Sequence, residues 1–290
     1  MNFLVERENM PGKDITEKVL EDYNDIFADI VNVLLYDGER QVAEEELKTI
    51  SVHSQYKDEE NILHEQERDV SKYWSKKGVN LVLYGIENQT KPEKKMPIRI
   101  FGYEGASYRS QLFSKKVAPV ITMVLYFGTE RHWNMSGNLK DILDIPDGLD
   151  KYVNDIHVNI FEIAWLTESQ VNKFTSDFKI VANFFVNKRR NKDYEPDDKT
   201  QIKHVDEVLK LLSIMTGDRR YEKILSNNAG VRNMCDVAQR LEDRGIQKGI
   251  EQGQNALSDS IHRLKAGETA ESIIASGIDA KTVELALTCL

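Results

Sequence analysis

The stretch GVNLVLYGIENQT, residues 78–90, decides how the chain can fold and where its chemistry can lie. An apolar run from Val79 to Ile86 is typical of a central strand that is covered on both faces. Side chains alternate between the two faces of a strand, so Glu87 and Gln89 are predicted to share one face and Asn88 to lie on the other. A carboxylate at the tip of such a strand is held rigidly, as a metal ligand must be. Taken alone, the stretch is also consistent with a strand that ends in a polar loop.

The sequence around this strand predicts a compact α/β unit that ends near residue 166. Residues 69–78, DVSKYWSKKG, are interpreted as the first arm of a hairpin that turns at Lys77-Gly78, with a helix as the open alternative. Apolar periodicity predicts helices over 14–36 and 96–116, and runs of β-branched and aromatic residues predict further strands over 119–128 and 158–166. The remaining segments are expected to be a short helix over 43–50 and a loop over 53–61.

The rest of the chain is predicted to be helical. Helices are expected over 169–189, 202–216 and 218–224, followed by two short helices around Gly277-Ile278. Between them, DRGIQKGIEQGQ (243–254) carries Gly245, Gly249 and Gly253 at an interval of four, which lines them up on one helix face and permits close backbone approach. Each glycine costs about 1 kcal/mol in helix propensity relative to alanine, so this segment is either a self-associating helix or a flexible tether. We divide the chain into an α/β domain (1–166), a helical extension (167–240) and a tail (241–290).

Composition restricts the class of protein. The chain is 40% hydrophobic and 30% charged, with no apolar run near the roughly 20 residues that cross a bilayer and no signal-peptide pattern, so a cytoplasmic protein without a membrane partner is expected. Cys235 and Cys289 have no zinc-site or disulfide spacing. The net charge of −9 combines −12 over residues 1–69 with +3 over the rest, so any contact with nucleic acid must be local.

Two carboxylates at neighbouring strand ends are suited to phosphodiester hydrolysis. Magnesium prefers oxygen ligands and commonly takes one or two carboxylates, and it lowers the pKa of an attacking water. Asp69 and Glu87 would supply the carboxylates if the hairpin brings them together, the backbone carbonyl of Asn88 a third oxygen, and Gln89 the group that orients the water. Asp29 is the candidate for an outer carboxylate, and Arg68 and Arg99 for holding phosphate oxygens. The alternative makes Asp69 a turn residue and Glu87 a surface acid.

These residues resemble the PD-(D/E)XK nuclease superfamily, in the branch called recombination-promoting nuclease (Rpn) or YhgA-like putative transposase. The resemblance rests on Asp69, on Glu87-Asn88-Gln89 at the end of an apolar strand, and on segments spread over nearly the whole chain; these are DIFADIVNVLLYDGE, ERDV, MPIR, PVITMVLYFG and GIQKGIEQG. Two departures are evident: Gln89 replaces the usual lysine, and Arg68 stands where the motif has proline, with Asp69 unusually far ahead of Glu87.

The resemblance implies a restriction-endonuclease-like core, a mixed central sheet flanked by helices, followed by an all-helical C-terminal region. It also implies a DNA endonuclease that depends on Mg²⁺ or Mn²⁺, associated with recombination, with DNA as partner and with Lys94 and Lys95 adding to the contact. We expect a homo-oligomer, most simply a dimer. The alternative is a nuclease fold whose chemistry has decayed and which serves as a nucleic-acid-binding or oligomeric interaction module.

Overall fold

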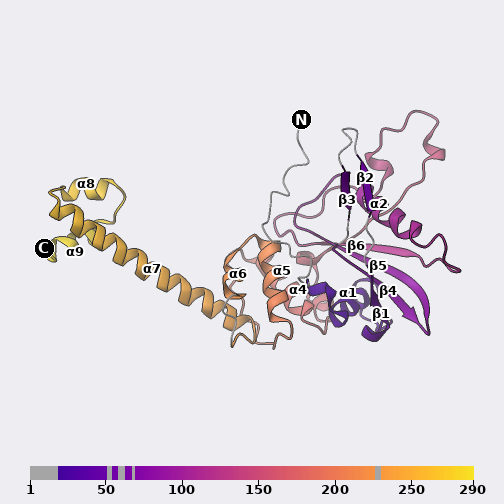
Figure 1. Cartoon of the computed structure of the whole chain (residues 1–290), viewed down its shortest axis with the longest axis horizontal. Helices are drawn as coiled ribbons and strands as arrows, with labels where there is room; N and C mark the ends of the chain where they lie inside the picture. The colour runs from indigo at the N-terminus through magenta and orange to yellow at the C-terminus, as the bar shows by residue number, and fades with distance from the viewer. Residues whose placement is uncertain (1–18, 51–53, 58–62, 67–68, 226–229) are drawn as a thin grey trace.

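The computed structural model describes residues 19–50, 54–57, 63–66, 69–225 and 230–290, and Figure 1 shows their arrangement. A body built around one mixed sheet carries a long helix that projects away from it and ends in a small helical cluster. The sheet has the strand order β1-β4-β5-β6-β7. Its strands are β1 (Leu47–Thr49), β4 (Val70–Lys76), β5 (Val79–Gln89), β6 (Val120–Tyr126) and β7 (Asn159–Glu162).

The hairpin predicted before residue 79 is confirmed, and it sets the register of the sheet centre. Strands β4 and β5 pair antiparallel, with Val70 opposite Ile86, and their turn places Lys77 and Gly78 at φ of +49° and +76°. A left-handed turn of this kind suits glycine, which has no Cβ to clash. Strand β5 then pairs parallel with β6, and β6 parallel with β7, so the sheet is mixed. The fold class predicted from the sequence is therefore confirmed.

Helices cover both faces of the sheet. Helix α1 (Asn24–Tyr36) packs with Tyr84 and Ile86 of β5 in the main hydrophobic core, which also includes the buried faces of α4 (Phe178–Arg190) and α5 (Val205–Thr216). Helix α2 (Met96–Arg109) packs through Met96, Ile100 and Tyr103 against Val124 and Val158 in a second cluster on the other face. The end of β5 is thus enclosed between two hydrophobic layers. The main core also continues across residue 166, where the sequence was divided.

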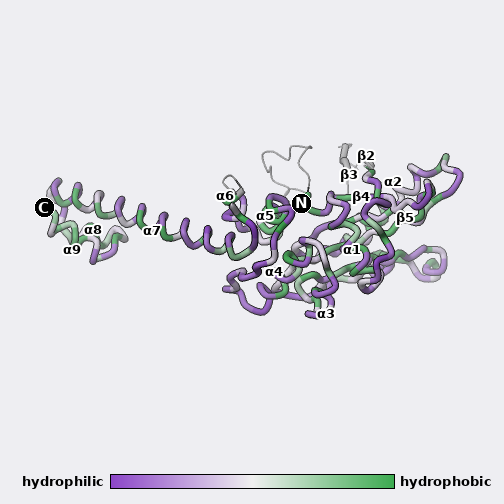
Figure 2. The backbone as a smooth tube through the Cα atoms, turned by 90° about the horizontal axis from the view of Figure 1, so that it is seen from below, coloured by the Kyte–Doolittle hydropathy of each residue, from purple (hydrophilic) through white to green (hydrophobic). Residues whose placement is uncertain are grey.

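The C-terminal part is helical, as predicted. The remaining helices are α3 (Glu168–Val171), α6 (Arg220–Leu225), α7 (Met234–Lys265), α8 (Ala270–Ala275) and α9 (Ala280–Thr288). The glycine repeat lies in α7, which Figure 2 shows to be mostly hydrophilic where it leaves the body. No helix among the described residues has both the length and the apolar character of a membrane span.

Several local predictions were wrong. Residues 43–50 form a 3-10 turn (Glu44–Glu46) followed by β1, because pairing of Leu47 with Trp74 of β4 overrides the helix propensity of the acidic run. The loop predicted over 53–61 contains β2 (Ser54–Lys57), which pairs with β3 (Leu63–Gln66). The strand predicted to Leu166 becomes a 3-10 turn after Glu162, and the helix predicted over 169–189 is split into α3 and α4.

The first helix also differs from its prediction. A 3-10 turn at Leu20–Asp22 is separated from α1 by Tyr23, whose backbone is extended. The fully buried ammonium of Lys72 in β4 fastens this break, because its Nζ donates to the carbonyl oxygen of Asp22 (2.6 Å) and to the side chain of Asn24 (2.8 Å). Residues 14–18 of the predicted helix lie outside the described residues.

Candidate functional site

The end of β5 places its polar side chains as the alternation rule predicts. Gln89 Nε2 donates to Glu87 Oε1 (3.2 Å) on the face covered by α2, whereas Asn88 Nδ2 donates to Glu21 Oε1 (3.0 Å) on the face of α1. The Glu87 side chain is only 2% exposed. Burial of a charged carboxylate is costly unless it is paired and hydrogen-bonded, so this position is specified by its surroundings and is not a surface acid.

Asp69 lies beside Glu87, immediately before β4. The pairing of Val70 with Ile86 continues the antiparallel register so that Asp69 stands opposite Glu87. Asp69 Oδ2 accepts a hydrogen bond from the backbone nitrogen of Asn88 (2.8 Å). The hairpin therefore brings together the strand ends that carry Asp69 and Glu87, as a two-carboxylate site requires.

Arg99 connects the first turn of α2 to the strand end. Its guanidinium binds Glu87 through Nη2 and Glu93 through Nη1, the second at 2.7 Å. Burial lowers the pKa of Arg99, but Glu87, Tyr103 and Glu93 together outweigh this effect and hold the pKa above its usual value. Burial, together with the charge of Glu87, raises the pKa of Tyr103, whose hydroxyl accepts from Arg99 Nη2 (3.3 Å). Arg99 was predicted to hold phosphate, and here its guanidinium is engaged by two carboxylates.

Glu21 is a third carboxylate near this strand end, and it was not predicted from the sequence. It is fully buried, and burial raises its pKa to about 7, with the charge of Asp69 contributing to the rise and hydrogen bonds from Asn88 and the backbone opposing it. Its Oε2 atom has no hydrogen-bond partner among the described residues. The apolar periodicity of the sequence did not indicate Glu21, because the position of its side chain depends on the interruption of the helix at Tyr23.

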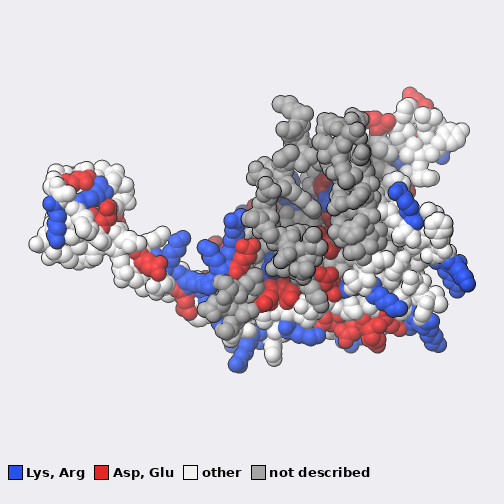
Figure 3. All heavy atoms as spheres, in the orientation of Figure 1, with Lys and Arg blue, Asp and Glu red and all other residues white. Residues whose placement is uncertain are grey.

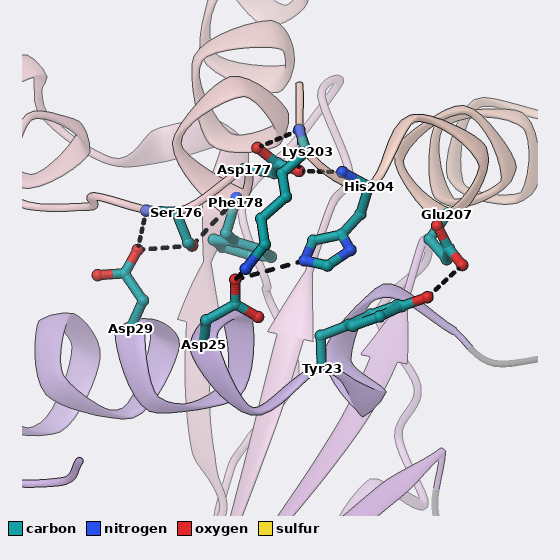
Figure 4. A network of polar contacts seen from close by, with 9 residues as sticks. All are labelled: Tyr23, Asp25, Asp29, Ser176, Asp177, Phe178, Lys203, His204 and Glu207. Carbon is teal, nitrogen blue, oxygen red and sulfur yellow. Dashed lines mark hydrogen bonds and ion pairs between the residues drawn. The ribbon is translucent and has the colours of Figure 1, made fainter. Parts of the chain in front are cut away.

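Asp29 points elsewhere. Its carboxylate accepts four hydrogen bonds from the backbone and hydroxyl groups of Thr175 and Ser176, at 2.7–3.1 Å, just before α4. Figure 4 shows Asp29 among a group of polar contacts that joins α1 to the helices after the sheet, with Asp25 bound to Lys203 and His204 nearby. These contacts give Asp29 a structural role, and they do not direct it toward Glu87.

The other predicted contact residues have different outcomes. Lys94 and Lys95 are exposed at the start of α2, on the same loop as Glu93. Arg68 lies outside the described residues.

The donor set suits a hard cation. Asp69 and Glu87 offer carboxylate oxygens at one strand end, whereas Glu21 lies with Asn88 on the opposite face of the sheet. No group of three or more His, Cys, Asp or Glu side chains in the described ranges is already arranged around one metal position. Magnesium commonly takes only one or two protein carboxylates and keeps several waters, so Asp69 and Glu87 fit such an ion.

The mixed sheet with helices on both faces is the α/β core expected of a nuclease-like fold, and carboxylates lie at the end of its central hairpin. Residues 46–213 match the family described as "Putative transposase, YhgA-like", and because the match covers more than half of the chain, the protein belongs to that family. Searches of curated proteins and of solved structures gave no match.

Proposed function

We propose that the protein is a magnesium-dependent DNA endonuclease of the recombination-promoting, transposase-like type. The observation that carries the proposal is the buried Glu87 at the end of β5, opposite Asp69 and hydrogen-bonded to Gln89. A buried carboxylate that faces polar partners at a strand end is the arrangement that metal-assisted hydrolysis needs. Membership of the YhgA-like family supports a role in DNA transactions.

The residues divide the chemistry between them. Asp69 and Glu87 would hold a magnesium ion, with the carbonyl of Asn88 as a further oxygen, and when bound the ion polarises a phosphate and lowers the pKa of an attacking water. Gln89 lies beside Glu87 and orients that water with its amide, which can both donate and accept. Glu21 accepts a hydrogen bond from Asn88 on the α1 side of the strand. Arg99 fixes the orientation of Glu87.

One observation favours a second candidate function. The guanidinium of Arg99 already neutralises Glu87, and a fixed positive charge on a carboxylate competes with a metal ion for it. A nuclease fold whose chemistry has decayed, and which binds DNA or other chains without cutting, would retain such an ion pair for stability. The two candidates differ in whether Glu87 is needed for turnover.

Plasmid nicking tests the proposal. Purified protein is incubated with supercoiled DNA with and without Mg²⁺, and Glu87→Gln is compared with Glu93→Gln. Glu93 binds the same guanidinium but lies on a loop with a 38% exposed side chain, so its loss leaves the strand end in place. Mg²⁺-dependent nicking that falls at least about 100-fold only in Glu87→Gln supports the endonuclease. Equal nicking by the two variants rejects the assignment of Glu87, and a folded protein that binds no Mg²⁺ by calorimetry favours the second candidate.

A further inference from the structure

Helix α2 is apolar on two opposite faces. Its inner face, with Met96, Ile100 and Tyr103, is buried against the sheet. Its outer face exposes a second apolar stripe, at intervals of three, seven and four residues, that continues beyond the helix end. This stripe contains Ile98 (46% exposed), Phe101 (54%), Tyr108 (42%) and Leu112 (69%). Apolar side chains gathered on an exposed face are characteristic of interaction sites, so the outer stripe indicates a binding surface.

The stripe ends in a loop that presents an aromatic residue to solvent. Phe113 is fully exposed, at 102%, and Val117 is 59% exposed. The base of the loop is fixed by the buried amide of Gln111, which accepts from the backbone nitrogen of Ala118 (2.8 Å) and donates to its carbonyl (3.2 Å). Tyr108 adds a contact, because its hydroxyl accepts from the nitrogen of Val120 (3.1 Å). A loop closed at its base in this way holds Phe113 outward.

The apolar stripe lies between two cationic ends. Residues 91–117 contain seven Lys and Arg against two Asp and Glu, in a chain whose net charge is −9. Lys94 and Lys95 precede the stripe, and Lys115 and Lys116 follow it, all exposed. In Figure 3, Lys and Arg side chains flank uncharged surface on the side of the molecule that carries α2 and the following loop. The 14 residues of α2 extend about 21 Å, a length that can follow several nucleotides of a single strand.

We propose that this surface, the outer stripe of α2 with the loop 112–117, binds single-stranded or locally unpaired DNA. Phe113 and Leu112 contact unstacked bases, while Lys94 and Lys95 at one end and Lys115 and Lys116 at the other contact phosphates. Aromatic side chains between cationic groups are the arrangement that binds single strands without sequence preference. The inner face of the same helix carries Arg99 to Glu87, so a strand bound along the outer face lies across α2 from the candidate site. The choice of DNA as the anion rests on the proposed function.

Fluorescence anisotropy in EDTA tests this proposal separately from cleavage. A labelled single-stranded 20-mer is titrated with the wild-type protein, with Phe113→Ala and with the double variant Lys115→Gln/Lys116→Gln, each over a range of salt concentrations. Because Phe113 is fully exposed, its replacement is not expected to unfold the protein, and thermal melting verifies this. The matched controls are Tyr152→Ala, which removes another exposed aromatic side chain (73%), and Lys199→Gln/Lys281→Gln, which removes two exposed lysines elsewhere.

The two variants are expected to have different effects. Phe113→Ala weakens binding about 5- to 150-fold with an unchanged salt dependence, because stacking carries no charge. The double lysine variant reduces the magnitude of the slope of log K against log salt by about 1.4. Each phosphate of a single strand that a lysine no longer neutralises accounts for about 0.7 of this change. Both controls bind as the wild type does.

Three results would overturn the proposal. The first is equal affinity of Phe113→Ala and wild type for DNA. The second is binding of anionic phospholipid vesicles that requires Phe113 while DNA binding does not. The third is a change of mass in solution when Phe113 is replaced, with no change in DNA affinity. That result would show that the stripe mediates contact between copies of the chain. If the protein does not nick plasmid but still binds DNA in a way that requires Phe113, the endonuclease proposal is rejected. The assignment of this surface to DNA binding then still stands.

Discussion

The guanidinium of Arg99 binds the buried carboxylate of Glu87 and the partly exposed carboxylate of Glu93 at the same time. The two ion pairs differ in burial, since the Glu87 side chain is 2% exposed and that of Glu93 is 38% exposed. Removing one partner of a buried pair costs more than removing one partner of an exposed pair, because the remaining charge stays away from water. The fold and the candidate site are therefore coupled at Arg99.

Arg99→Met is expected to lower the free energy of unfolding by about 3 kcal/mol, because the charge of Glu87 stays buried without that guanidinium. Urea unfolding at pH 7.5 measures the change. Glu93→Gln, the control, is expected to cost less than about 1 kcal/mol. Equal effects of the two substitutions would show that burial of Glu87 does not determine the strength of the pair.

Glu21 makes the stability of the protein depend on pH. Burial raises its pKa to about 7 from an unfolded value of 4.5, so between these values the native state binds more protons than the unfolded state. Stability from this group therefore falls as pH rises from about 4.5 and is fully lost above about 7, by about 3 kcal/mol in total. Glu21→Gln keeps an acceptor for Asn88 and removes the titration.

Urea unfolding of both proteins from pH 5 to pH 8.5, in EDTA, measures this difference. The variant is expected to be the more stable protein at pH 8 and the difference to vanish near pH 5. Parallel pH curves for the two proteins would contradict the raised pKa.

Asp29 is expected to affect stability and not turnover. Asp29→Ala removes an acceptor of four hydrogen bonds from Thr175 and Ser176 and is expected to destabilise the protein by about 2–3 kcal/mol. The control Asp37→Asn removes an exposed ion pair with Lys173 and is expected to cost less than about 1 kcal/mol. If folded Asp29→Ala loses nicking activity at unchanged DNA affinity, Asp29 belongs to the chemistry after all.

The differences between sequence and structure have physical causes. The alternation of side chains along β5 was sufficient to predict which face Glu87, Gln89 and Asn88 occupy, because this alternation depends only on neighbouring residues. Glu21 was not predictable in this way, because the chain breaks at Tyr23, where contacts with the distant α5 region fix the side chain. The Tyr23 hydroxyl donates to Glu207 (2.6 Å) and its ring stacks on His204 (3.8 Å between centroids). Periodicity within 14–36 carries no information about partners so far along the chain.

The amide of Gln89 is expected to matter for turnover. Gln89→Ala removes the group beside Glu87 that orients water and is expected to reduce nicking about 10- to 100-fold with little change in DNA affinity. Gln89→Lys places an ammonium where the PD-(D/E)XK motif that these residues resemble has a lysine, and it is expected to retain activity. Nicking rates at saturating DNA measure both variants, and an unaltered rate in Gln89→Ala would remove Gln89 from the mechanism.

The glycine repeat of α7 is expected to hold two copies of the chain together. Every residue from 242 to 255 is exposed, and a Cβ added at Gly245, Gly249 or Gly253 meets no atom within 4 Å. A lone solvated helix with three glycines is poorly stabilised, at about 1 kcal/mol for each glycine, and a second helix packed on the glycine face offsets that cost. Deleting residues 243–290 is therefore expected to reduce the number of chains per particle from two to one, as obtained from the mass by light scattering, while Met234 and Val237 remain to complete the core.

The triple variant Gly245→Ala/Gly249→Ala/Gly253→Ala separates the two interpretations of this repeat. Alanine raises helix propensity but blocks close backbone approach, so a helix pair packed through the glycines dissociates at lower concentrations of denaturant, whereas a simple tether gains helicity with no change of mass. An unchanged number of chains per particle after the deletion would exclude association through this helix, and the glycines would then serve flexibility between the body and the terminal helices.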